Sequence, residues 1–233
     1  MVAVTLLQTS GLTKRYDGLV AIDNVDFRLD EGEVRALIGP NGAGKTTFVG
    51  MLSGRIKPSA GQVFFKGGDV TNAPAHRRIQ MGMGYTFQVT SIFARLTMLE
   101  NAKLAVNGDA DKAIAALEEV GLAARANTLA GEQSYGHQRL LELAMGIAPQ
   151  PSLLILDEPT QGFDAHEIAS FLDLMARVRE RSTVLLIEHN IAVVMAVADK
   201  ITVLNFGEIL AEGSPDEIQA NPDVQAAYLG TEQ

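Results

Sequence analysis

One stretch decides the fold of this 233-residue chain: Gly39-Pro40-Asn41-Gly42-Ala43-Gly44-Lys45-Thr46. It fits the pattern G-x-x-x-x-G-K-[ST]. Val34 to Ile38 before it is predicted to be a buried strand, and Thr47 to Ser53 after it carries apolar residues at helical spacing. Small residues let the backbone curl so that several N–H groups face one anion, and the helix N-terminus adds partial positive charge. The sequence therefore predicts a phosphate-binding loop.

The loop has two side chains with specific predicted roles. Lys45 is placed to neutralise the β- and γ-phosphates of a nucleotide, and the Thr46 hydroxyl to hold Mg²⁺. An ordinary glycine-rich corner between a strand and a helix is the alternative, but it would not require the Lys-Thr pair. We expect nucleotide contacts from the whole loop: Gly39, Pro40, Asn41, Gly42, Ala43, Gly44, Lys45, Thr46 and Thr47.

The composition limits the possible partners. The chain has 19 basic and 28 acidic residues, a net charge of −9, and no cysteine. Nucleic acid and anionic membrane surfaces are disfavoured, because both require clustered Lys and Arg. Disulfides and thiolate metal sites are excluded. No secretory signal pattern opens the sequence and no apolar run approaches 18 residues, so we expect a soluble intracellular protein.

Three apolar runs predict the strands of a parallel sheet: Val34 to Ile38, Leu153 to Leu156 and Thr183 to Ile187. Each is followed by a helical pattern, which is typical of a parallel sheet covered on both faces. The first run ends in the phosphate loop, the second in Asp157-Glu158-Pro159 and the third in Glu188-His189. Ligands of such sheets bind outside the carboxyl ends of the strands, so these endings are expected to form one site.

The remaining segments complete the expected fold. Val4 to Thr9 and Ala21 to Leu29 alternate like half-buried strands, whereas two helical patterns and no strand pattern lie between Gln88 and Pro149. The predicted class is α/β: a P-loop NTPase core with a mostly parallel sheet, an N-terminal antiparallel β subdomain and an inserted α-helical lobe. We expect a single domain, residues 1–233, with residues 1–87 and 150–233 as the nucleotide-binding core and 88–149 as the lobe.

The strand endings offer catalytic side chains. Asp157 is placed to hold Mg²⁺, and Glu158 to orient and polarise an attacking water, although acidic residues also favour helix starts. The His189 imidazole could donate to a γ-phosphate oxygen. Gln88 could touch Mg²⁺ or the attacking water. His76 and His166 are expected at the surface.

A further segment, Ser134-Tyr135-Gly136-His137-Gln138-Arg139, resembles the serine-glycine-glycine-glutamine signature of ABC-type ATPases. The other motifs of that family stand in the same order along essentially the whole chain. The resemblance implies that Tyr16 stacks on adenine, that Asp164 lies in a dimer-contacting loop, and that two cassettes sandwich two ATP molecules with Mg²⁺. Each phosphate loop would then face the signature of the partner chain: Ser134, Tyr135, Gly136 and His137.

Within that family the chain looks like the ATPases of branched-chain amino acid importers. The similar segments are Gly18 to Asp23, Thr86-Phe87-Gln88, Ile187 to Asn190, and the tail from Ala211 to Gly230. The resemblance implies a cytoplasmic subunit held at the inner face of the membrane by permease subunits, paired with an identical or sister ATPase and served indirectly by a solute-binding protein. Gln88 and the loop after it would touch the permease. Close relatives carry urea or short amides.

The sequence also departs from the family pattern. Gln133, Tyr135 and His137 replace the usual signature residues, the stretch from Thr97 to Gln133 is short, and Gln161-Gly162-Phe163 precedes Asp164. Other classes fit less well. ABC ATPases without a transport role carry two cassettes, a coiled coil or a basic arm, GTPases and kinases leave the signature unexplained, and a pure binding module would lack Glu158.

Overall fold

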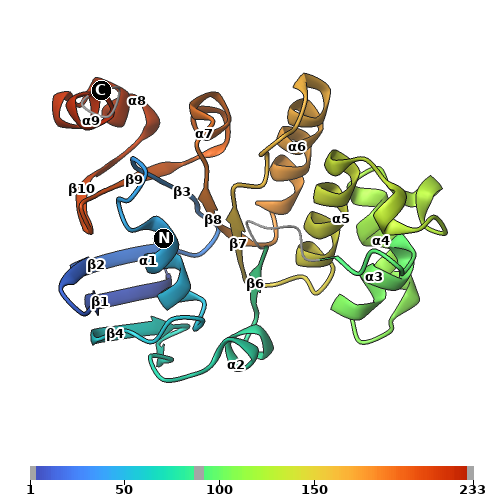
Figure 1. Ribbon diagram of the computed structural model, residues 1–233, viewed down its shortest axis with the longest axis horizontal. Helices are drawn as coiled ribbons and strands as arrows, with labels where there is room; N and C mark the ends of the chain where they lie inside the picture. The colour runs from blue at the N-terminus through green and yellow to red at the C-terminus, as the bar shows by residue number, and fades with distance from the viewer. Residues whose placement is uncertain (1–3, 87–91, 230–233) are drawn as a thin grey trace.

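The computed structural model describes residues 4–86 and 92–229. Two β-sheets lie side by side, with helices around them (Figure 1). The first sheet is antiparallel, in the order β2-β1-β4-β5. Its strands are β1 (Thr5–Tyr16), β2 (Leu19–Asp30), β4 (Ala60–Phe65) and β5 (Gly68–Asp69). This is the antiparallel subdomain expected from the alternating pattern.

The second sheet has the order β10-β9-β3-β8-β7-β6 and is parallel except for β10. Its strands are β3 (Val34–Ile38), β6 (Met83–Tyr85), β7 (Leu153–Asp157), β8 (Thr183–Ile187), β9 (Lys200–Asn205) and β10 (Glu208–Gly213). The three predicted core strands are thus adjacent, as β3-β8-β7, and their carboxyl ends share one edge. The predicted α/β class is confirmed.

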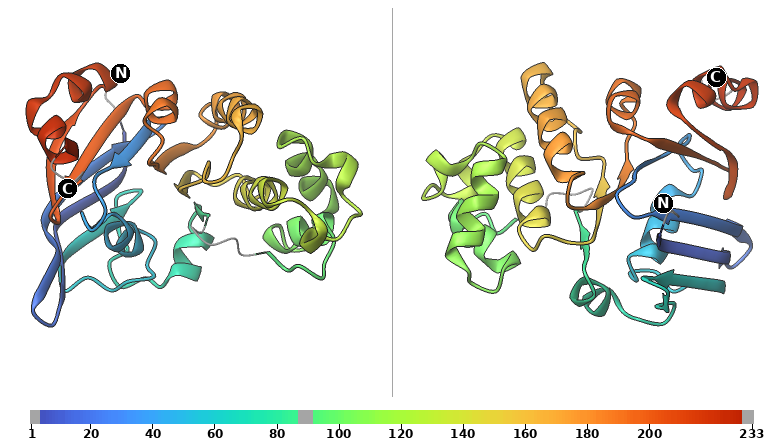
Figure 2. Two further views of the ribbon diagram at one scale, coloured as in Figure 1. Left: turned by 45° about the horizontal axis from the view of Figure 1, so that its top comes forward. Right: turned by 180° about the vertical axis from the view of Figure 1, so that it is seen from behind.

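Helices lie on both faces of this sheet and beyond its β6 edge (Figure 1). The described helices are α1 (Lys45–Leu52), α2 (Ala75–Gln80), α3 (Met98–Ala105), α4 (Ala110–Glu119), α5 (Tyr135–Ile147), α6 (Ala165–Val178), α7 (Ile191–Val197), α8 (Pro215–Ala220) and α9 (Pro222–Leu229). Short 3-10 turns lie at Ala123–Arg125 and Ala130–Glu132. Both views of Figure 2 place α3, α4 and α5 at the end of the molecule opposite β1, β2 and β4.

The alternation along β7 shows how the sheet is buried. Leu153 and Ile155 pack in the core shared with the antiparallel sheet and α1, whereas Leu154 and Leu156 pack in a second core with α3 to α6. All four side chains are at most 1% exposed. Burial of every residue explains why the strand is continuously apolar rather than alternating. Because both faces of β7 are buried, its polar residues can lie only at the end of the strand.

The helix behind the phosphate loop is fixed at its far end by a buried arginine. Arg78 of α2 is 1% exposed and donates to the carbonyls of Met51 and Leu52 at 2.7 and 2.6 Å. These carbonyls belong to the last turn of α1, where carbonyl groups have no N–H donor within the helix. Burial lowers the pKa of Arg78 to about 10. The arginine therefore neutralises the negative end of the α1 dipole in a dry environment.

Several elements were not predicted from the sequence. The strand β6 has only three residues, which is too short for a periodicity. The helix α3 begins with a capping box formed by Thr97 and Glu100, a local signal that was present in the sequence. No helix in the described ranges is both long and apolar enough to cross a bilayer.

Candidate functional site

The phosphate loop is wound around the Lys45 ammonium. Its Nζ donates to the carbonyls of Gly39 at 2.6 Å and Pro40 at 3.0 Å. Gly39 has φ +151°, and a Cβ there would lie 2.1 Å from the carbonyl oxygen of Leu204. A side chain at this position would push the loop away from β9. Burial lowers the pKa of Lys45, and the charges of Glu158 and Asp157 oppose that effect.

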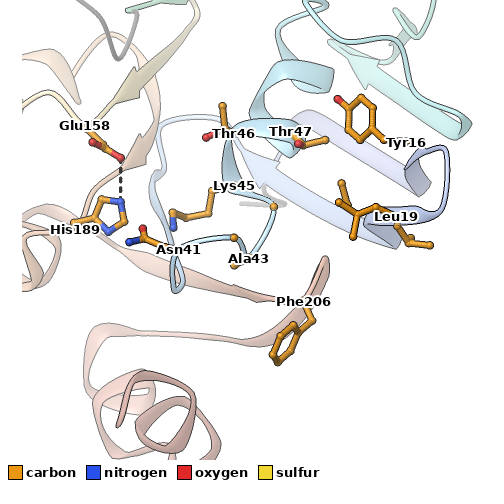
Figure 3. Close-up of a pocket in the computed structure, with 14 residues that line it drawn as sticks. Tyr16, Leu19, Asn41, Ala43, Lys45, Thr46, Thr47, Glu158, His189 and Phe206 are labelled. Atoms are coloured by element: carbon orange, nitrogen blue, oxygen red, sulfur yellow. Dashed lines mark hydrogen bonds and ion pairs between the residues drawn. The ribbon is translucent and has the colours of Figure 1, made fainter. Parts of the chain in front are cut away.

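A pocket of about 500 Å³ opens over this loop. It is lined by Tyr16, Leu19, Val20, Ala21, Asn41, Gly42, Ala43, Gly44, Lys45, Thr46, Thr47, Glu158, His189 and Phe206. Figure 3 shows Glu158 and His189 at one end, with Tyr16, Leu19 and Phe206 toward the other. The pocket therefore has a charged end, a cradle of backbone N–H groups and an apolar end, which suits a flat group joined to a chain of phosphates.

The carboxylate at the charged end is held in an uncommon backbone conformation. Glu158 has φ +50°, which costs a non-glycine residue about 1–2 kcal/mol. Its N–H donates to the Ile187 carbonyl at 2.8 Å, and its carbonyl accepts from Arg139 Nη2 at 2.7 Å. Its Oε1 accepts a hydrogen bond from His189 Nε2 at 3.0 Å. The two predicted catalytic side chains, which follow β7 and β8, are thus in direct contact.

A buried glutamate positions His189. Glu188 is 4% exposed and accepts from the backbone N–H groups of Thr160 at 2.9 Å, His189 at 2.8 Å and Asn190 at 3.1 Å. These bonds join the segment after β8 to the segment after β7. The sequence places Glu188 at this strand end but predicts no role for its side chain, although a charged residue directly after an apolar strand is a usable signal.

Asp157 lies beneath the pocket rather than in its wall. It is 3% exposed, and its Oδ2 accepts from the Tyr85 hydroxyl at 2.6 Å. Burial raises the pKa of Asp157, the Tyr85 hydrogen bond opposes this, and Glu158 adds to it. The Tyr85 hydroxyl in turn accepts from Arg55, whose guanidinium stacks 3.9 Å from the Tyr85 ring centre. Tyr85, which the sequence did not reveal, joins the end of β6 to the end of β7.

The donors near the loop fit a magnesium ion that is completed by phosphate and water. Thr46 offers an exposed hydroxyl and Asp157 a carboxylate, both hard oxygen donors. Among residues 4–86 and 92–229, no three His, Cys, Asp or Glu side chains gather as a metal site. Mg²⁺ keeps several waters and binds through one or two carboxylates with substrate phosphates, so this sparse donor set suits it. Gln88, the third predicted ligand, lies outside the described residues.

The signature residues form a separate helix start. Ser134 is the N-cap of α5; its Oγ accepts from the His137 N–H at 3.3 Å and lies 3.0 Å from His137 Nδ1. A Cβ on Gly136 would lie 1.9 Å from Glu167 Oε1, so this position has no room for a side chain. Tyr135 is 48% exposed. The structure does not bring this segment into the pocket of its own chain.

The other predicted residues have these positions. Tyr16 and the loop from Asn41 to Thr47 line the pocket, and Gly39 and Pro40 face the Lys45 ammonium with their carbonyls. Asp164 caps α6 by accepting from the N–H groups of His166 and Glu167 at 2.8 Å each. His76 and His166 are exposed, as expected.

Comparison with known proteins identifies the family. The sequence model described as "ABC transporter" matches residues 22–161. The chain belongs to the ABC transporter family. It is an ATPase of the ATP-binding cassette type, a family that binds ATP and generally Mg²⁺. A second model, described as "Branched-chain amino acid ATP-binding cassette transporter", matches residues 208–233.

Relatives cover nearly the full length of this cassette. It is 38% identical to the high-affinity branched-chain amino acid transport ATP-binding protein LivG of Salmonella typhimurium, over 97% of this chain and 98% of LivG. The chain is 37% identical to BraF of Pseudomonas aeruginosa, also described as a high-affinity branched-chain amino acid transport ATP-binding protein, over 97% of this chain and 98% of BraF. It is 34% identical to the lipopolysaccharide export system ATP-binding protein LptB of Acidithiobacillus ferridurans, over 97% of each chain.

A solved structure is also similar. The ADP conformation of MJ1267, an ATP-binding cassette of an ABC transporter, superposes with a TM-score of 0.89 at 26% identity, over 97% of this chain and 99% of that chain. The family membership inferred from the sequence is therefore confirmed at the level of the fold.

Proposed function

We propose that this cassette is the ATP-hydrolysing subunit of an importer for branched-chain amino acids. The observation that carries the solute class is the match of residues 208–233 to a branched-chain amino acid model, together with 37–38% identity to LivG and BraF over nearly the whole chain. The similarity to LptB, at 34%, is the reason why an export role needs an experimental test. Import of urea or short amides is the other candidate.

We assign the charged end of the pocket to the attack on the γ-phosphate. Glu158 orients and polarises the attacking water, because it is the carboxylate that lines the pocket at that end. The hydrogen bond from His189 Nε2 fixes the orientation of this carboxylate. His189 itself is 46% exposed and is placed to donate to a phosphate oxygen when it turns from Glu158.

The phosphates would be held by the loop. Backbone N–H groups from Asn41 to Thr47 and the Lys45 ammonium neutralise their charge, while Tyr16 packs on the base. Mg²⁺, when bound, would supply positive charge that neutralises the phosphates. Thr46 and Asp157 would hold it, with Gln88 as a further candidate ligand. The Tyr85 hydrogen bond keeps Asp157 in one orientation.

A second cassette would complete the site. In importers, ABC cassettes work as dimers with membrane permease subunits. Each signature segment, with the Ser134 hydroxyl and the first N–H groups of α5, would cover the terminal phosphate in the partner's pocket. Tyr135, Gly136 and His137 would lie at this junction, and Asp164 in the neighbouring loop. The partner is an identical or a sister chain, and a solute-binding protein acts indirectly.

The permease would bind at the groove beside β6. This groove of about 450 Å³ has a mainly apolar lining that includes Ile79, Met83, Met145 and Pro149. Its lining includes Tyr85, whose hydroxyl donates to Asp157, so a helix from a permease loop would act on the site through Tyr85. We place the protein at the inner face of the membrane through this contact. The division into a core (1–87 and 150–233) and a lobe (88–149) remains a proposal of the same kind.

Uptake in cells tests the solute. A strain lacking the gene should lose high-affinity uptake of labelled leucine, isoleucine and valine, and the wild-type gene should restore it. Glu158→Gln should be expressed at the same level, bind ATP and fail to restore uptake. Normal leucine uptake with lost urea uptake would favour the alternative, and an envelope defect with normal uptake of both would favour export.

A further inference from the structure

Phe206 is in an unfavourable place for a phenylalanine. It is 87% exposed, more than any other large apolar side chain described. It lies in the turn between β9 and β10, where Asn205 pairs with Glu208. Phe206 and Gly207 both have positive φ, +47° and +83°, as in a two-residue type I′ turn. Such turns favour Asn-Gly, and a bulky residue at positive φ costs about 1–2 kcal/mol. Neither burial nor turn geometry accounts for the aromatic ring.

The turn that carries Phe206 is fixed to the phosphate loop. The Gly207 N–H donates to the Ala43 carbonyl at 3.0 Å, and the Gly207 carbonyl accepts from the Asp23 N–H at 2.9 Å. Ala43 is inside the loop, and Asp23 is on β2. These two bonds hold the backbone of the turn against the phosphate loop. Phe206 therefore starts from a fixed point at the rim of the pocket that it lines.

The surroundings of Phe206 define the ligand chemistry. The ring lines the pocket together with Tyr16, Leu19 and Val20, which are 43%, 65% and 36% exposed. Figure 3 shows Phe206 with Leu19 and Tyr16 away from Glu158 and His189. This end of the pocket is apolar and open, so a flat aromatic ring would remove several exposed side chains from water at once.

We propose that Phe206 contacts the base of the bound nucleotide and, with Tyr16 and Leu19, forms an apolar slot for it. The proposal rests on the nucleotide role assigned to the pocket and adds a residue from the C-terminal hairpin to the base site. It gives a reason for the presence of a ring in a turn that would be more stable with asparagine. The ring contributes by stacking and by burial, because its side chain has no hydrogen-bonding atom.

Two ligands separate contact with the base from support of the loop. Mg²⁺-AMP-PNP carries the base, whereas inorganic tripolyphosphate with Mg²⁺ carries only the phosphates. Calorimetric titration of the purified chain should show that Phe206→Ala weakens AMP-PNP binding by about five- to fiftyfold. Tripolyphosphate affinity should stay within about twofold. An equal loss for both ligands would mean that the turn merely supports the loop, and would overturn the proposal.

Phe206→Asn is the sharpest variant, since it improves the turn while it removes the ring. We expect a higher Tm than wild type without ligand and weaker AMP-PNP binding. Phe206→Tyr should keep wild-type affinity, and Val4→Ala, at another exposed apolar side chain, serves as the control. Unchanged AMP-PNP affinity in Phe206→Asn, even with impaired transport, would place the ring at a protein interface and refute the inference. Failure of the wild type to bind either ligand would instead refute the nucleotide site itself.

Discussion

Arg139 joins the signature helix to the catalytic strand end, and its replacement should cost more stability than most single substitutions. Its side chain is 2% exposed and forms an ion pair with Glu142, 7% exposed, at 2.6 Å. It also donates to the carbonyls of Glu158 at 2.7 Å and Asp157 at 3.3 Å. Removing one partner of a buried pair typically costs about 3–5 kcal/mol. Domains are stable by only about 5–15 kcal/mol, so Arg139→Met should lose a large share of the total.

The assay is urea unfolding followed by circular dichroism, since the chain has no tryptophan. The double variant Arg139→Met with Glu142→Leu provides the control: removing both charges should recover at least about half of the loss. ATP turnover at a temperature where Arg139→Met is folded should also fall, because the carbonyl of Glu158 loses its donor. A loss of stability below about 1 kcal/mol, with unchanged turnover, would refute this account of the junction.

Three further outcomes are expected. Lys45→Ala should abolish the ATP-induced rise in Tm and weaken ATP binding at least about tenfold, since a charge-assisted bond to phosphate is lost; equal affinity in a titration would contradict the cradle. The pKa of Asp157 is raised in the folded chain above its ordinary 3.8, so stability falls as pH rises through the window above 3.8. Asp157→Asn should therefore raise the ligand-free Tm at pH 7 by about 2 °C or more, and it should abolish hydrolysis. The difference in Tm between the variant and the wild type should vanish near pH 3.5. A lower Tm for the variant at pH 7 would show that the ionised Asp157 stabilises the fold, contrary to this account. Gly136→Ala should lower the free energy of unfolding by about 1 kcal/mol, because Glu167 must leave the cap of α6. In a Glu167→Ala background the same substitution should cause no further loss. A full additional loss of stability in that background would show that a contact other than Glu167 excludes the side chain.

Residues could be predicted from the sequence when their roles depend on the residues directly beside them in the chain. Lys45 and Thr46 belong to one continuous loop, and Glu158 and His189 each follow a continuously apolar strand. In a parallel sheet this local fact fixes their position in space, because all strand ends meet at one edge. For this reason the hydrogen bond between Glu158 and His189, 31 residues apart, connects two predicted residues.

Residues whose roles depend on distant partners were not predictable. Tyr85 acts on Asp157 from 72 residues away, and its short strand has no periodic signal. Arg139 ends the signature segment, but the sequence contains no signal that its side chain donates to the carbonyl of Glu158. Phe206 lies in the turn between β9 and β10, and nothing in the sequence of that turn indicates a pocket. In each case the determining fact is the pairing of segments, which a single sequence does not contain.

The strand that leads into the phosphate loop has a consequence for synthesis of the chain. Both neighbours of β3 in the sheet, β8 and β9, come from residues after position 182, and the loop packs against the carbonyl of Leu204. While the ribosome is still making the first four fifths of the protein, that strand has neither of its lateral partners. We therefore expect the phosphate loop to take its folded form only after β8 and β9 have emerged from the ribosome.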